Sequence, residues 1–451
     1  MPVALIVLAA GMGTRMNSDL PKVLHPVAGE ALLIHAISAG EALAPARTVV
    51  VAGHGANAVR GTVAAHDSAA QVVLQTEQLG TAHAVAQAAE TLHDFDGDAL
   101  VLYGDTPFIR PETLARMQEA RQSHDIVVLG FAPADPGRYG RLVMEGESLI
   151  RIVEFKDASA DERDIGLCNS GVVMAPAGLL FDLVAAVEND NAAGEYYLTD
   201  IVGLARARGL KATAVTCDEA ETLGVNSRTE LAAAEAAFQA RARAEALETG
   251  ITMPAPDTVH FARDTAVGRD VVIEPYVVFG PGVTIETGAQ IRAFSHLEGC
   301  HVSRGAVVGP YARLRPGTEL SEDVRIGNFV EVKNALIAEG AKVNHLSYIG
   351  DAEIGERSNI GAGTVTCNYD GVGKHRTTIG ADVFIGSDTM LVAPVSVGDG
   401  AMTGSGSVIT RDVEAGALAV ARARQENKPG FATRLVARLR AAKDQTRKGD
   451  R

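Results

Sequence analysis

A glycine-rich loop with two basic residues follows the first apolar run of the chain. The stretch Leu8–Arg15 contains Gly11 and Gly13, and Lys22 follows shortly after it. The two glycines allow the backbone to approach a phosphate chain closely and to present N–H groups to it. Arg15 and Lys22 add the positive charge that a reacting triphosphate needs. Gly-x-Gly alone occurs in many sharp turns, but this combination predicts a triphosphate-binding loop.

The elements around that loop must position it. Short apolar runs alternate with helical patterns in the first half of the chain, which predicts an α/β fold with a parallel sheet covered by helices on both faces. Ligands of such sheets bind beyond the carboxyl ends of the strands. The expected strands are Val3–Leu8, Thr48–Ala52, Val72–Gln75, Ala99–Tyr103 and Ile126–Phe131, and the expected helices are Leu32–Leu43, Thr81–Leu92 and Pro111–Ser123.

Polar residues follow two of these strands at their carboxyl ends. Gln75 and Gln78 come at the end of the third strand, with Gly80 and Thr81 beside them. An amide side chain there can read the edge of a uracil. Asp105 follows the fourth strand, where a carboxylate can hold Mg²⁺ against an α-phosphate. Taken alone, Asp105 is equally well explained as a helix N-cap.

An aliphatic residue recurs at almost every sixth position from Val267 to Ile409, with a few single-residue steps and one gap. Neither a helix nor an ordinary strand has this period, so it indicates a repeat architecture. One inward aliphatic residue for each short strand is typical of a β-helix built from hexapeptides. Three hexads make one coil, so the 24 positions predict eight coils that are stable only as a stack. A β-sandwich with chance spacing would not keep this register.

The register of the hexads also predicts which outward side chains lie above one another. Arg315 stacks over Lys333, and two such cations suit a sugar phosphate. His345 begins another file, meaning a column of outward side chains on successive coils. An imidazole there can take the proton of an attacking amine. A single surface histidine is more often inert, so the register by itself leaves both interpretations open. The small residues that continue the file leave a groove for a long thin ligand, and they are Ala362, Ser387 and Ser405.

The one large gap in the repeat lies between Thr366 and Ile379 and adds seven residues to a hexad. Its polar segment Cys367–Thr378 is expected to be extruded from the β-helix, and long loops in compact repeats are usually functional.

Ahead of the repeat, Ser227 and Glu230 predict a capping box at the start of an Ala-rich helix that joins the two halves.

Motifs in both halves of the chain occur in the order seen in one family. Besides the loop Leu8–Lys22, they are Gly140, Glu154–Asp157, Asn169–Gly171, Glu195–Asp200, Val225–Asn226 and His345–Tyr348. The chain resembles the bacterial bifunctional enzymes that are both N-acetylglucosamine-1-phosphate uridyltransferases and glucosamine-1-phosphate N-acetyltransferases. The resemblance implies a Rossmann-like nucleotidyltransferase domain over 1–228, a helical linker over 229–249, and a left-handed parallel β-helix with a C-terminal tail over 250–451.

For the first half, the resemblance implies that UTP reacts with N-acetylglucosamine 1-phosphate in the presence of Mg²⁺. The sugar phosphate oxygen attacks the α-phosphorus and pyrophosphate leaves, so positioning and charge neutralisation carry most of the rate. Arg15 and Lys22 are then catalytic, and Asp105 and Asn226 hold the metal. The residues implied to bind the nucleotide and the sugar are Leu8, Ala9, Ala10, Gly11, Lys22, Gln75, Gly80, Thr81, Tyr103, Gly104, Asp105, Gly140, Glu154, Asn169 and Asn226.

For the second half, the resemblance implies that acetyl-CoA acetylates glucosamine 1-phosphate, with His345 as the base. It also implies homotrimers that bind the coenzyme between neighbouring prisms. Two departures affect the coenzyme site: Phe431 stands where relatives carry Trp, and Ser405 replaces a more usual Ala. The residues implied for the amino sugar phosphate are Arg315, Lys333, Tyr348 and Asn359, and those for acetyl-CoA are Ala362, Asn368, Tyr369, Ser387, Ser405 and Arg422.

Composition limits the partners and the compartment. The net charge of −15 argues against nucleic acid, because phosphate binding needs a basic surface. Four cysteines without a Cys-x-x-Cys pair fit a reducing compartment, and the apolar start is too short to cross a membrane. We therefore expect a cytoplasmic enzyme that acts on small molecules. The main alternative is a nucleotidyltransferase with a merely structural β-helix, and another is a non-catalytic scaffold.

Overall fold

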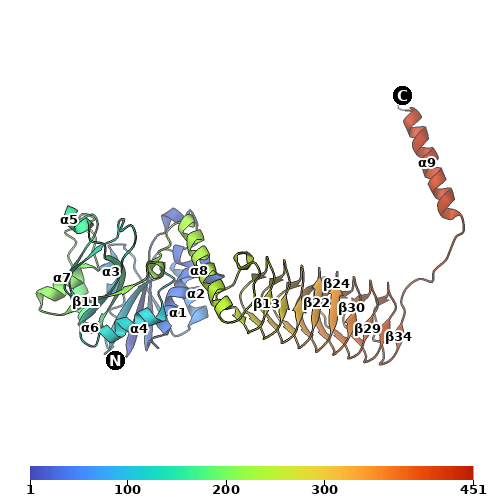
Figure 1. Cartoon of the computed structure of the whole chain (residues 1–451), viewed down its shortest axis with the longest axis horizontal. Coiled ribbons are helices and arrows are strands. Elements are labelled where there is room, and N and C mark those ends of the chain that lie inside the picture. The colour runs from blue at the N-terminus through green and yellow to red at the C-terminus, as the bar shows by residue number, and fades with distance from the viewer. Residues whose placement is uncertain (450–451) are drawn as a thin grey trace. The chain divides into compact units, whose positions relative to one another are not determined.

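The computed structural model describes residues 1–449, and the chain divides into two compact units (Figure 1). The first unit contains Met1–Glu248 and His260–Thr265, and the second contains Thr249–Val259 and Ala266–Arg451. The last two residues of the predicted second domain, 450 and 451, lie outside the described part of the chain. Among residues 1–449, no helix combines the length and the apolar character that crossing a membrane requires.

The first unit is built on a sheet with the strand order β11-β7-β10-β6-β1-β4-β5. The bounds are β1 (Val3–Ala9), β4 (Arg47–Ala52), β5 (Gln71–Leu74), β6 (Asp98–Tyr103), β7 (Ile126–Phe131), β10 (Cys168–Pro176) and β11 (Ala212–Cys217). The predicted α/β fold is confirmed, and the five expected strands β1, β4, β5, β6 and β7 run parallel to one another, but a strand that the sequence did not predict breaks the pattern. Strand β10 is antiparallel to β6 and β7. A hairpin of β8 (Arg141–Glu145) and β9 (Ser148–Val153) replaces the crossover helix before β10, so the chain enters the sheet from the opposite end.

Helices cover both faces of this sheet, as the alternation predicts. Successive residues of β1 enter opposite cores, since Ile6 packs in the core of Ile201 and Leu5 packs in the core of Leu114. Strand β5, predicted to be buried, lies at the edge of the sheet and leaves Leu74 exposed. One face carries α1 (Leu32–Glu41), α2 (Ala56–His66) and α4 (Pro111–Ala120), and the other carries α3 (Thr81–Ala86), α6 (Ala177–Val184) and α7 (Asp200–Ala207).

The helix α8 (Arg228–Glu248) has one of the two hydrogen bonds of the predicted capping box, and the second comes from the residue before the cap. Ser227 Oγ accepts the N–H of Glu230 at 3.2 Å, while the Glu230 carboxylate accepts the N–H of Asn226 at 2.6 Å. Phe238 packs in a small core of first-unit residues. By its contacts α8 therefore belongs to the first unit, and the division of the chain falls at the end of this helix rather than before it.

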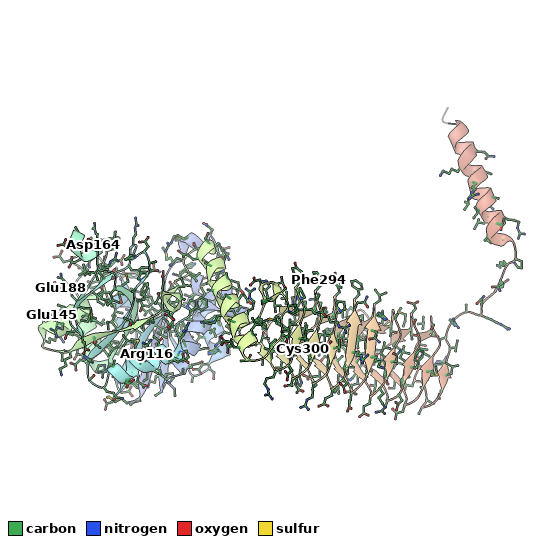
Figure 2. All side chains as sticks on the ribbon, viewed as in Figure 1. Arg116, Glu145, Asp164, Glu188, Phe294 and Cys300 are labelled. Carbon is green, nitrogen blue, oxygen red and sulfur yellow. The ribbon has the colours of Figure 1, made fainter. Side chains whose placement is uncertain are left out.

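The second unit is a parallel β-helix, as the hexads predict, and it is left-handed, as the resemblance implies. Each inward residue stacks on the one predicted a coil earlier, for example Val308 on Ile291 and Val332 on Leu314. These inward residues are almost completely buried, whereas Phe294 projects outward (Figure 2).

The strands of this β-helix form three rows of stacked, parallel segments. The first row is β12 (Ala266–Val267), β15 (Val283–Ile285), β18 (Cys300–Val302), β21 (Thr318–Leu320), β23 (Glu331–Ile337), β25 (Tyr348–Ile354), β28 (Thr377–Ile379) and β31 (Val395–Val397). The second is β13 (Val272–Ile273), β16 (Gln290–Ile291), β19 (Val307–Val308), β22 (Arg325–Asn328), β24 (Lys342–His345), β26 (Asn359–Ile360), β29 (Phe384–Ile385), β32 (Met402–Thr403) and β34 (Leu418–Ala419). The third is β14 (Val278–Phe279), β17 (His296–Leu297), β20 (Arg313–Leu314), β27 (Val365–Cys367), β30 (Met390–Val392) and β33 (Val408–Ile409), with the first halves of β23 and β25 between β20 and β27.

The stack continues past the predicted last hexad at Ile409. Thr403 pairs with Ala419, and Val397 forms a bridge with Val413. A further partial coil therefore precedes the helix α9 (Phe431–Gly449). The periodicity missed this coil because small residues such as Ala419 take the place of the bulky aliphatic ones.

Candidate functional sites

The glycine-rich loop leaves β1 and enters two short 3-10 helices, η1 (Thr14–Met16) and η2 (Lys22–Leu24). Gly13 has a φ of 61°, and a Cβ at this position would lie 2.6 Å from Lys22 Cβ. A side chain there is therefore excluded both by backbone conformation and by space. The tight turn brings Lys22 directly against the loop, whereas Arg15 in η1 stays exposed.

A cleft of about 340 Å³ opens at the carboxyl ends of β1, β5 and β6. Segments that are far apart in the sequence meet there, at the edge of the sheet where ligands of this architecture bind. Gly104 backs the cleft and donates its N–H to Leu8 O at 2.9 Å. The lining residues include Leu8, Ala9, Ala10, Gly11, Lys22, Gln75, Gln78, Gly80, Thr81, Tyr103, Asp105 and Glu195.

Two amide side chains hold the walls of this cleft in place. Gln78 Nε2 donates to Ala10 O at 2.8 Å, and Gln75 Nε2 donates to Gly80 O at 3.1 Å. Gly80 has a φ of 119°, and a Cβ there would lie 2.5 Å from Tyr196 O. Glycine is therefore required at this point, where the loop around Tyr196 closes one side of the cleft. Gln75 is buried and faces the interior of the site.

A second group of predicted residues lies around the start of β10. Asn169 donates its N–H to Gly140 O at 2.9 Å, and a Cβ on Gly140 would lie 3.4 Å from the Glu154 carboxylate. Thr199 Oγ1 donates to Glu154 Oε1 at 3.2 Å, and burial raises the pKa of Glu154. Tyr103 lines both the main cleft and a small cavity beside Asn169. The two groups are therefore neighbours, joined through Tyr103.

The two predicted metal ligands lie together although they are far apart in the sequence. The Lys22 ammonium is between them, paired with Asp105 Oδ2 and donating to Asn226 Oδ1 at 2.9 Å. Residues 1–449 hold no group of three or more His, Cys, Asp or Glu arranged for a metal ion. Mg²⁺, however, usually takes only one or two carboxylates and completes its shell with water and substrate phosphates. One carboxylate and one amide oxygen therefore fit this ion.

The predicted file of cations is present on the β-helix, and an acid faces each of its members. Arg315 Nη1 lies 2.8 Å from Glu331 Oε1, and Lys333 Nζ lies 3.6 Å from Asp351 Oδ2. Lys374 from the inserted loop joins this cluster, and the neighbouring Lys333 ammonium lowers the pKa of Lys374. The hexad register could not identify Lys374, because a loop residue has no place in it.

The inserted loop is only partly extruded, contrary to the expectation for the whole segment. Tyr369 is exposed and pairs with Lys374 across a short hairpin. Asn368, in contrast, is buried, and its amide donates to the Asp351 carboxylate. A polar residue can be buried here because the Asp351 carboxylate accepts the hydrogen bond that the Asn368 amide donates. The base of the loop is thereby attached to the cation cluster.

His345 lies exposed at the end of β24, one coil after Asn328. Its Nδ1 atom is 2.8 Å from Asn328 Oδ1. An amide oxygen can only accept a hydrogen bond, so this contact places the proton on Nδ1 and leaves Nε2 as the basic nitrogen. Asn328 was not among the predicted residues, although the same register places it one coil before His345.

The file beyond His345 consists of small residues and is flat. A Cβ at Gly386 would lie 2.5 Å from Ser405 N, so the coils approach closely here. Tyr348 pairs with Glu331 in the third row of strands, which also carries Arg315 and Lys333. Asn359 lies in the second row, which carries His345. Arg422 and Phe431 come after the last coil and are exposed. The small residues on successive coils are Ala362, Ser387 and Ser405.

Three family models match parts of the chain. A model of the MobA-like NTP transferase domain matches residues 5–167, which include the cleft-forming strands. A model of the GMPPB C-terminal domain matches residues 296–393, and a model of bacterial transferase hexapeptides (six repeats) matches residues 376–411. These matches assign a nucleotidyltransferase unit to the first half and hexapeptide repeats to the second.

Full-length relatives decide the family. The bifunctional protein GlmU of a Cereibacter sphaeroides strain is 69% identical over 99% of this chain and 98% of its own length. The bifunctional protein GlmU of Jannaschia sp. is 66% identical over 98% of both chains, and that of Roseobacter denitrificans is 68% identical over 100% of both. The chain belongs to the GlmU family. The predicted family and the predicted bifunctional enzyme, a uridyltransferase and an acetyltransferase, are confirmed, and nucleotidyltransferases of the GlmU family use a divalent metal ion.

Proposed function

We propose that the cleft of the first unit transfers UMP from UTP to N-acetylglucosamine 1-phosphate and that the β-helix acetylates glucosamine 1-phosphate with acetyl-CoA. Acetylation comes first and supplies the substrate of the second reaction, which yields UDP-N-acetylglucosamine. The observation that carries this assignment is the presence of two separate polar sites, each with the groups that its reaction needs. A nucleotidyltransferase with a merely structural β-helix would have no use for the second site.

In the first site, a phosphate oxygen of the sugar phosphate attacks the α-phosphorus of UTP, and pyrophosphate leaves as the new P–O bond forms. Backbone N–H groups around Gly11, together with Arg15 and Lys22, bind the phosphate oxygens. Asp105 and Asn226 hold Mg²⁺, which offsets the charge that develops on the α-phosphate. The step needs little from a side-chain base, and the chain acts by positioning and charge neutralisation.

The nucleotide base and the sugar occupy the two neighbouring groups of residues. Gln75 reads the uracil edge from its buried position at the end of β5. Glu154 and Asn169 bind the hydroxyl and acetamido groups of the sugar. The half-buried Glu154 carboxyl has lost part of its hydration, which raises its pKa, so hydroxyl donors from the sugar add to the hydrogen bond that it accepts from Thr199.

In the second site, His345 Nε2 takes a proton from the amine of glucosamine 1-phosphate. The nitrogen then bonds to the thioester carbonyl carbon, the C–S bond breaks, and the coenzyme leaves as a thiol after taking a proton. Asn328 keeps the His345 ring in the productive tautomer. Arg315 and Lys333 bind the sugar phosphate, and Lys374 adds a third positive charge from the loop.

A homotrimer that holds acetyl-CoA between neighbouring β-helices is part of the proposal. Four aromatic rings stack along one corner of the β-helix with centroids 4.9 to 5.2 Å apart. Each is 47% to 55% exposed, and large exposed apolar patches usually mark protein contacts. Light scattering should give three times the chain mass of 47.0 kDa, and a wild-type monomer would contradict the trimer. The rings belong to Tyr276, Phe294, Tyr311 and Phe329.

Two assays on one preparation test the assignment of both activities. With glucosamine 1-phosphate and acetyl-CoA, the enzyme should release free thiol. With N-acetylglucosamine 1-phosphate, UTP and Mg²⁺, it should release pyrophosphate. Pyrophosphate without thiol would identify the β-helix as merely structural, and the absence of both products would favour a non-catalytic scaffold.

The cytoplasm is the proposed location, since all four cysteines are free and a reducing compartment keeps them so.

A further inference from the structure

Lys22 lies at the point where the metal ion is proposed to bind. Its ammonium bridges Asp105 Oδ2 and Asn226 Oδ1, which are the two oxygens assigned to Mg²⁺. The Lys22 side chain is only 10% exposed, so little water competes for these contacts. A cation that belongs to the chain therefore satisfies both oxygens.

We propose that Lys22 substitutes for the metal ion and keeps the metal site closed until a triphosphate binds. The inference rests on the proposed function, because it takes Asp105 and Asn226 as the metal ligands. Mg²⁺ needs ligand oxygens at about 2.1 Å, so an ammonium held by the same two oxygens excludes it by contact and by charge repulsion. Metal binding thus requires the Lys22 ammonium to leave.

The glycine-rich loop provides the place to which the ammonium moves. Lys22 Nζ lies 3.9 Å from the position that a Cβ on Gly11 would take, so it already adjoins the loop that binds phosphates. A small rotation of the lysine side chain exchanges Asp105 for phosphate oxygens of the nucleotide. The nucleotide thereby draws the lysine away as it delivers the metal ion. Binding of metal and triphosphate is then cooperative, and each raises the affinity for the other by the same factor.

Calorimetric titration of Mn²⁺ into the nucleotide-free enzyme tests this role. Wild-type enzyme should bind Mn²⁺ weakly, and Lys22→Met should bind it at least about tenfold more tightly, the order expected when one adjacent charge near a protein surface is removed. Lys22→Arg keeps the charge and should bind as weakly as the wild type. Arg15→Met is the matched control, because it removes a charge from the same loop at an exposed position, and it should change the affinity less than about threefold.

The second arm of the experiment separates this inference from the metal assignment. Adding Asp105→Asn to Lys22→Met should abolish the gain in affinity. If Lys22→Met gains nothing, or gains no more than Arg15→Met, Lys22 does not close the site, and the inference is overturned. The metal assignment survives that result if a non-hydrolysable UTP analogue still promotes Mn²⁺ binding that depends on Asp105. If binding in the presence of the analogue is independent of Asp105, the metal assignment fails and the inference fails with it.

Discussion

Replacing Asn328 should impair acetyl transfer through its effect on His345. Asn328 Oδ1 lies 2.8 Å from His345 Nδ1, and this contact selects the tautomer with a basic Nε2. Asn328→Ala removes one neutral hydrogen bond worth about 1 kcal/mol, so kcat for acetylation should fall about fivefold to tenfold. The pH at which activity falls on the acid side should change little, because the lost partner is uncharged.

Asn328→Asp should instead move the pH profile. A carboxylate at the same distance stabilises the imidazolium form of His345, so the ring stays protonated up to a higher pH. The neutral imidazole, which is the form that acts as the base, is then absent over a wider range of pH. The acid limb of the kcat profile should therefore move to higher pH by about one unit. The assay follows free thiol from acetyl-CoA at saturating substrate across the pH range.

Uridylyl transfer by the same preparations is the internal control and should keep its wild-type rate and pH profile. The orienting role of Asn328 would be refuted if both variants retained the wild-type kcat profile and changed only KM for acetyl-CoA. That outcome would mean that Asn328 contacts the coenzyme and does not orient the histidine. The tautomer can also be read directly, since the ¹⁵N shifts of His345 should show Nδ1–H in wild-type enzyme and a mixture in Asn328→Ala.

Three further changes test other parts of the molecule. Asp105→Ala should abolish metal-dependent pyrophosphate release and leave thiol release intact, so unchanged pyrophosphate release would remove Asp105 from the site. His345→Ala should lower acetyl transfer by about a hundredfold or more, the scale of a lost general base, with uridylyl transfer preserved; acetylation near the wild-type rate would require another base. Ile360→Ala, at a position only 2% exposed, should destabilise the β-helix by about 2 to 5 kcal/mol in urea unfolding. Val392→Ala, on the outside of the same stack, is its control and should cost less than about 1 kcal/mol.

The arrangement of the residues at the second candidate site was largely predictable, because the repeat converts sequence spacing into spatial spacing. Each hexad is one short strand, and strands stack at a constant distance, so a residue's position in the hexad decides its row. Arg315 and Lys333 are therefore neighbours in the structure as the register predicts. Asn328 obeys the same rule and could have been found. Lys374 could not, because its position depends on how the inserted loop folds back.

The first unit was predictable in its elements and less so in their arrangement. Apolar runs located β1, β4, β5, β6 and β7 within about two residues, since a buried strand is continuously apolar, but β8, β9, β10 and β11 were not predicted. The antiparallel course of β10 depends on the hairpin before it, and the exposure of β5 depends on its place at the edge. Neither property is encoded in the composition of the strand itself. The packing of α8 onto the first unit likewise depends on which surface meets Ala234 and Phe238.

The sequence by itself determined the two folds, the glycine-rich loop and the inward and outward faces of the β-helix. It did so because hydrophobic period and glycine placement act locally, through burial and backbone sterics. The resemblance already implied that Asp105 and Asn226 meet, but only the tertiary structure decided that the Lys22 ammonium lies between them, at the position proposed for the metal ion. Lys22 lies in the short helix η2, and Asp105 and Asn226 lie in two loops; these connecting segments are placed by long-range packing of the elements they join. That Lys22 binds an anion was therefore predictable from its residue type, whereas its contacts with Asp105 and Asn226 were not.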